Sequence, residues 1–111
     1  MTDLILVYIT TSGAEEAEKL ARMILSEKLA SCVNIYQGVR SFYLWEGAVE
    51  TSEEATLVVK TVSFLYEELA KRVREEHSYD LPCIVAIPVL YAEKKYEEWI
   101  KRETSREGRV G

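Results

Sequence analysis

The chain has few of the residues that cross-link, break or kink a small protein. Its 111 residues include two cysteines, two prolines, five glycines and one histidine. Two cysteines cannot build a disulfide framework, so we expect Cys32 and Cys83 to be free thiols in the reducing cytoplasm. No apolar run approaches the ~20 residues that cross a bilayer, and the N-terminus lacks the basic leader of a secretory signal. The sequence therefore predicts a cytoplasmic protein with no membrane partner.

Positive charge and amide side chains are also scarce. The formal net charge is -5, whereas nucleic-acid binding rests on neutralising phosphates with Lys and Arg. We therefore expect no nucleic-acid partner. Asn34 and Gln37 are the only amide residues. Few amides beside many Glu and Lys is a bias of heat-adapted proteins, which leaves a thermostable protein from a thermophile as one open interpretation.

What remains is the pattern of a single domain, residues 1–111, with one core. β-favouring apolar runs predict strands, and apolar residues at helical spacing predict helices. The predicted order is strand 4–9, helix 14 to 29 or 30, strand 32–45, strand 48–62, a helix from Ser63 to His77, strand 83–89 and helix 92–103. This is the α+β, ferredoxin-like βαββαβ plan with an extra C-terminal helix: an antiparallel four-stranded sheet with helices on one face.

Local signals mark the boundaries of these elements. Ser12 and Glu15 have the spacing of a capping box, in which the glutamate reaches back to the start of the helix. Ser63 is placed to cap the second helix through its hydroxyl. Gly38 predicts a bulge or bend within the second strand, and Glu46-Gly47 predicts the turn that follows it.

The predicted hairpin from Cys32 to Val62 has unusually long strands, and its outer part has apolar residues on both sides. Strands usually have five or six residues. Val39, Tyr43 and Trp45 would face one side of its outer part, and Phe42 and Leu44 the other. One interpretation is an arm folded back under the last helix. The other, which we favour, is an arm that pairs with further copies of the chain and closes their open edges.

HSYDLPC, residues 77–83, is the segment with the clearest potential for chemistry. His77 ends a helix, where it could simply bond the backbone, or could act as a ligand or proton shuttle. Glu76 and Asp80 could supply oxygen to a metal ion beside it. H-x-x-D-x-x-C is not an established metal spacing. Cys32 and Cys83 are weaker ligand candidates, since a free cysteine in an apolar strand is usually a core residue.

Catalytic and nucleotide-binding motifs are missing from the sequence. It has no phosphate-binding G-x-x-x-x-G-K-[ST], no G-x-G-x-x-G and no G-x-S-x-G, and no nucleophile–base pair can be identified. We therefore expect no enzymatic activity and no obligatory cofactor. Lys60 lies among apolar residues in LVVKTV. Two interpretations stay open: it extends to solvent from an edge strand, or it meets a carboxylate or anion.

Several segments taken together resemble one family. ASCVNIYQGVRSFYLWEGAVE, the later VVKT, HSYDLPCIVAIPV and YEEWI are similar to the CutA family of divalent-cation tolerance proteins. The resemblance runs from LILVYIT to Trp99. It departs from the family pattern at Ser78 and Asp80, which stand where proline and glutamate are common. Ile9 and Glu76 replace a cysteine and a histidine that take part in some copper-binding members.

The resemblance implies a homotrimer whose long hairpins join sheets between subunits. It also implies binding of Cu²⁺ or another divalent cation, for which we predict His77, Glu76 and Asp80 as ligands. A cleft between subunits would gather the family-typical residues Cys32, Trp45, Lys60, Tyr79 and Pro82. The alternative is a trimeric small-molecule or anion sensor of the PII type, with Lys60, Tyr79 and Trp45 lining that cleft.

Overall fold

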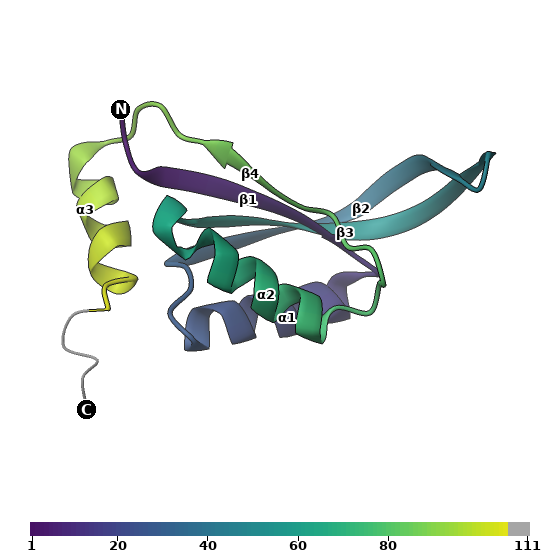
Figure 1. Ribbon diagram of the computed structural model, residues 1–111, viewed down its shortest axis with the longest axis horizontal. Helices are drawn as coiled ribbons and strands as arrows, with labels where there is room; N and C mark the ends of the chain where they lie inside the picture. Colours follow the sequence, from purple (N-terminus) through teal and green to yellow (C-terminus); the bar gives the residue numbers. More distant parts are fainter. Residues whose placement is uncertain (107–111) are drawn as a thin grey trace.

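The computed structural model describes residues 1–106, which form a four-stranded antiparallel sheet and three α-helices (Figure 1). The elements in chain order are β1 (Leu4–Thr11), α1 (Ala14–Ser26), β2 (Cys32–Trp45), β3 (Ala48–Val62), the 3-10 turn η1 (Ser63–Leu65), α2 (Tyr66–Glu76), β4 (Ile84–Pro88) and α3 (Lys94–Glu103). The strand order is β2-β3-β1-β4, with every neighbouring pair antiparallel. The predicted α+β, ferredoxin-like class is confirmed.

The core lies between one face of the sheet and the helices α1 and α2. Alternate residues of β1 and β3 point to this face, and the apolar stripes of the two helices cover them. Buried members of this core include Val7, Ile9, Leu20, Ile24, Leu57, Val59, Leu69 and Val73. Each such side chain contributes roughly 1.5–3 kcal/mol by leaving water. The core therefore fixes the sheet and two helices as one unit.

The opposite face of the sheet, which we name the open face, has little cover. It carries the other alternate residues, paired across the strands: Leu6, Tyr8, Asn34, Tyr36, Glu54, Thr56, Val58, Lys60, Val85 and Ile87. Val85 and Ile87 are exposed. At one end the helix α3 approaches, and the Nζ of Lys60 lies 5.8 Å from the centre of the Tyr96 ring. At the other end of this face Glu54 and Thr56 are buried, whereas Tyr36 is exposed like Val85 and Ile87.

Beyond the body, β2 and β3 continue as a two-stranded arm, residues 39–54, that projects away from the rest of the chain (Figure 1). Its partners shift between Tyr36 and Val39, so the bulge predicted at Gly38 is confirmed. Glu46 and Gly47 both have positive φ, as the tight turn of a hairpin requires. The helix α3 lies at the other end of the molecule. The interpretation that the arm folds under the last helix is therefore wrong.

Several predicted boundaries need correction. The helix α1 ends at Ser26, and the chain turns at Lys28, which has φ 57°. Leu29 and Ala30 are buried in the core although they lie outside the helix, so their apolar character extended the prediction too far. The Ser63 side chain caps no helix, because Ser63 itself begins η1.

The last helix begins at Lys94, two residues after the predicted start. Within this helix Ile100 is buried and Trp99 partly buried, whereas Tyr96 is exposed. None of the helices within residues 1–106 has the length and apolar character needed to span a membrane.

Candidate functional site

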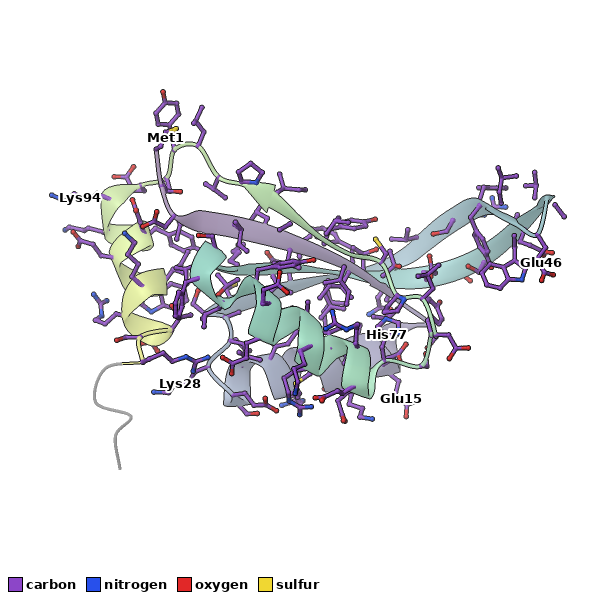
Figure 2. The ribbon with its side chains drawn as sticks, viewed as in Figure 1. Met1, Glu15, Lys28, Glu46, His77 and Lys94 are labelled. Atoms are coloured by element: carbon purple, nitrogen blue, oxygen red, sulfur yellow. The ribbon has the colours of Figure 1, made fainter. Side chains whose placement is uncertain are left out.

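The predicted site lies where the loop after α2 passes the end of β1 and the arm leaves the body. Figure 2 shows His77 at this junction and Glu46 far away at the tip of the arm. The His77 backbone N–H donates to the Val73 carbonyl at 2.8 Å, which ends the helix. The loop that follows carries Tyr79 and Cys83 toward β4. The local fold thus brings the HSYDLPC segment against the sheet.

The His77 side chain is fully buried and both ring nitrogens have partners. Nδ1 accepts from the Tyr79 backbone N–H at 3.0 Å, and Nε2 lies 2.8 Å from the Thr10 carbonyl oxygen. A nitrogen that accepts carries no proton, so this pattern fits the tautomer with Nε2–H donating to Thr10. In a single chain the His77 ring therefore links the backbone of β1 to the backbone of the loop through two hydrogen bonds.

Glu16 anchors the same loop from the other side. Its carboxylate accepts from the backbone N–H and hydroxyl of Ser12, and from the backbone N–H and hydroxyl of Ser78, at 2.7–3.0 Å. Burial alone would raise the pKa of Glu16, but these four hydrogen bonds outweigh it and lower the pKa to about 2. The capping-box prediction was wrong in its residue: Glu16, one position after Glu15, reaches back to Ser12.

A second carboxylate, Glu54 on β3, lies at the base of the arm. The residue is only 8% exposed. One carboxylate oxygen accepts from the Ser41 hydroxyl and the other from the Tyr79 hydroxyl, the latter at 2.7 Å. Burial, followed by the bond to Glu54, raises the pKa of the Tyr79 phenol. The Tyr79 ring also packs on the His77 ring with centres 4.8 Å apart. Glu54, Tyr79 and His77 thus form one connected cluster.

The predicted metal ligands do not gather within the described chain. Glu76 is exposed, with a carboxylate oxygen 3.9 Å from an Arg72 nitrogen, and Asp80 is exposed in the loop. Among residues 1–106, no three His, Cys, Asp or Glu side chains lie together as a metal site. The ligand role of Glu76, His77 and Asp80 stays a prediction.

The two cysteines are free and partly buried. Cys32 opens β2 opposite Lys60, whereas Cys83 lies just before β4. Burial and then the charge of Glu54 raise the pKa of the Cys83 thiol. Cys83 therefore belongs to the neighbourhood of Glu54, while Cys32 lies toward the far end of the open face.

The predicted cleft residues are spread along one chain rather than gathered. Trp45 pairs with Ala48 at the tip of the arm, and Lys60 lies twelve residues further along β3, which is about 40 Å in an extended strand. Tyr79 and Pro82 share the loop beside Glu54. Lys60 lies on β3, an inner strand, so its interpretation as an edge-strand lysine is wrong. A cleft with all these residues would require more than one chain.

Sequence reasoning missed Glu16, Ser41 and Glu54. Glu16 is one of two adjacent glutamates, and the spacing rule selects the other. Glu54 lies in the acidic run EE of a strand that alternates in and out. A glutamate directly before the apolar run ATLVV was the one available signal that its side chain is drawn into the fold.

Known proteins are similar to this chain in sequence and in fold. The family model described as CutA1 divalent ion tolerance protein matches residues 5–103. The divalent-cation tolerance protein CutA of Archaeoglobus fulgidus is 44% identical over 94 residues, 85% of this chain and 91% of that protein. The chloroplastic CutA 1 of Oryza sativa subsp. japonica is 44% identical over 100 residues, 90% of this chain.

The chain spans 56% and 55% of the length of that rice protein and of its Arabidopsis thaliana counterpart. The crystal structure of CutA1 from Oryza sativa matches with a TM-score of 0.92 at 42% identity, over 95% of this chain and 96% of that one. These likenesses favour divalent-cation tolerance over the PII-type sensor alternative.

Proposed function

This chain belongs to the CutA1 divalent ion tolerance family, and from that membership we propose that it acts as a homotrimer that binds divalent cations, with Cu²⁺ the first ion to test. The proposed role is binding rather than catalysis, with no obligatory cofactor and with the cytoplasm as its location. The observation that carries the proposal is the apolar arm, because its large exposed apolar side chains are left uncovered in a single chain.

The arm exposes large apolar side chains on both of its faces. Phe42, Leu44, Trp45 and Val49 are 63%, 75%, 54% and 69% exposed. Covering each of them contributes on the order of 1–2 kcal/mol. Large apolar side chains exposed in this number on one arm are typical of a protein–protein interface. The four side chains supply a driving force for assembly on a scale that can offset part of the cost of association.

Strand edges support the same conclusion. The strands β2 and β4 form the two edges of the sheet, and β2 is an edge over its full 14 residues. Its outer backbone groups have no neighbouring strand in the described chain. Proteins seldom leave a long edge of this kind open, because it pairs with other chains. Three copies arranged in a ring would let each arm meet the next copy.

Sedimentation velocity at micromolar concentration tests the assembly. We expect a particle with the mass of three chains. Leu44→Glu places a charge in the exposed apolar surface and should shift the particle toward one chain, whereas Lys19→Glu, at an exposed position of α1 away from the arm, should not. A folded wild-type particle with the mass of one chain would refute the trimer.

Cation binding is tested separately. Exposed carboxylates of Glu76 and Asp80 can supply oxygen ligands, and His77 can contribute only if an ion displaces one of its two hydrogen bonds. Calorimetric titration with Cu²⁺ should show binding to the wild type that falls at least tenfold in Glu76→Gln/Asp80→Asn. Glu67→Gln, an exposed carboxylate early in α2, is the control. Equal affinity in all three proteins would show that the carboxylates of Glu76 and Asp80 are not cation ligands. His77→Ala would then test the imidazole alone.

A further inference from the structure

We propose that Glu54 of one copy forms an ion pair with Lys60 of a neighbouring copy, and that this contact closes the ring of chains. The inference rests on the homotrimer of the proposed function and names the polar contact that completes it. The open face carries both groups, at opposite ends of one strip of β3.

Glu54 is a buried carboxylate that lacks a cation. Its two hydrogen-bond donors, the hydroxyls of Ser41 and Tyr79, are neutral. Within the described part of the chain, no Lys, Arg or His nitrogen lies within 4.0 Å of it. An ionised carboxylate removed from water is destabilising by several kcal/mol unless a positive charge accompanies it. In the single chain the Glu54 carboxyl group thus has two hydroxyl donors but no cation beside it.

The Thr56 hydroxyl, close to Glu54 on β3, also lacks a polar partner in the described chain. Thr56 lies two residues from Glu54, so both side chains project from the same face of β3. Thr56 is only 2% exposed, and its hydroxyl has no hydrogen-bond partner among residues 1–106. Buried hydroxyls are almost always bonded. A lysine ammonium has three donors, which can serve a carboxylate and a nearby hydroxyl together.

Lys60 has the complementary deficit. Its side chain is partly buried on an inner strand, and its ammonium contacts the Tyr96 ring at 5.8 Å. No carboxylate oxygen lies within 4.0 Å of it in the part of the chain that the structure describes. Of the strand residues on the open face, Lys60 is the only cation. It is therefore the sheet-borne group that can neutralise Glu54.

The two groups cannot meet within one chain. They lie six residues apart on the continuous strand β3, which is about 20 Å. Between them and beside them the open face is largely apolar, with Val58, Tyr8 and Val85. Glu54 is already buried in the single chain, and a second copy that covers this strip would also remove water from the partly buried Lys60. Under those conditions a charge left unpaired weakens assembly strongly, so pairing decides the register.

The pair also has the direction that a ring needs. Glu54 pairs with Val39, where the arm begins, and Lys60 lies against Tyr96 of α3. The arm and α3 are at opposite ends of the molecule (Figure 1). A contact between opposite ends joins copies head to tail, and such contacts form rings when the rotation closes. Each copy in the ring gives one Glu54 and one Lys60.

A double-mutant cycle on the trimer tests the pair. Glu54→Gln and Lys60→Met keep shape and remove charge. Each should raise the concentration at which half of the trimer dissociates, measured by light scattering on dilution in fixed guanidinium, by tenfold or more. The double variant should be no worse than either single one, because it leaves no unpaired charge. Glu53→Gln, its exposed neighbour, is the matched control and should change nothing.

Cross-linking tests the proximity of residues 54 and 60 in neighbouring copies by a second route, without charge-removing variants. In a Cys32→Ser/Cys83→Ser background, Glu54→Cys/Lys60→Cys treated with a short bismaleimide should give covalent trimers on a denaturing gel. The two single cysteine variants should not cross-link alone, but their mixture should give dimers. Products that stop at the dimer in the double variant would overturn the ring.

The outcomes separate this inference from the proposed function. A wild-type protein that is a single chain at all concentrations refutes the trimer itself. A wild-type trimer in which the two charge effects simply add, or in which neither variant matters, overturns the ion pair and leaves the trimer standing. Loss of Cu²⁺ binding in Glu54→Gln with unchanged assembly also overturns the pair, because the carboxylate would then serve an ion.

Discussion

The hydrogen bonds to Glu16 allow a stability effect to be worked out from the structure. Its carboxylate is 12% exposed and accepts four bonds from Ser12 and Ser78. These bonds lower its pKa from the usual 4.5 to about 2. At about 1.36 kcal/mol for each pKa step, that difference corresponds to at most about 3 kcal/mol of stability at neutral pH.

The sign of the pH dependence follows from the direction of the change. The carboxylate is a stronger acid in the folded chain than in the unfolded one. The stabilisation is therefore complete above the unfolded value of about 4.5 and is lost as the pH falls through the folded value of about 2. Glu16→Gln cannot accept all four bonds, since its amide nitrogen faces N–H donors. We expect this variant to lose about 2–3 kcal/mol at pH 7 and much less at pH 2.

Guanidinium unfolding at fixed protein concentration, at pH 7, 4 and 2, measures this difference. Glu18→Gln is a matched control on the same helix, because Glu18 pairs only with exposed Arg22 at 2.9 Å. Such a pair contributes about 0.5 kcal/mol or less. A gap between wild type and Glu16→Gln that stays constant from pH 7 to pH 2 would refute the reasoning.

Three further predictions concern single groups. Burial and the bond to Glu54 raise the pKa of Tyr79, so one of the seven tyrosines should ionise last in an alkaline ultraviolet titration, and this component should vanish in Tyr79→Phe. Gly47→Ala puts a side chain at φ +83° and should cost about 1 kcal/mol, seen as a lower thermal midpoint; an unchanged midpoint would contradict the turn geometry. Burial and then the charge of Glu54 raise the pKa of Cys83, so in a Cys32→Ser chain the remaining thiol should react with iodoacetamide more slowly than free cysteine at pH 8, and equal rates would count against it.

The sequence predicted the element order because its periodicity changes clearly between strands and helices. The bulge at Gly38 and the turn at Gly47 were also predictable, because glycine is the residue that such backbone positions favour. Boundaries failed where tertiary burial overrides local pattern. Leu29 and Ala30 are apolar because the core covers them after the helix has ended. Helical spacing cannot distinguish those two cases.

The candidate site was predicted in part, and the reason lies in distance along the chain. His77 and Tyr79 drew attention through a local segment, and the structure joins them to Glu54, which precedes His77 by 23 positions. Spacing rules detect residues on one helix or loop, whereas this cluster forms only after the sheet has paired. Whether His77 contacts an ion stays a prediction, because its bonds to Thr10 and Tyr79 are those of a structural residue.

The extra residue in β2 sets the phase of everything beyond it. Between Tyr36 and Val39 this strand advances three positions while its partner advances two, from Thr56 to Glu54. Even-numbered residues of β2 therefore share a side with odd-numbered ones further out. A strand that kept Gly38 but paired regularly, without the bulge, would hold one parity throughout, so that Phe42 and Leu44 would exchange sides with Tyr43 and Trp45. The single extra residue of the bulge thus determines which side chains of the arm face a neighbouring chain.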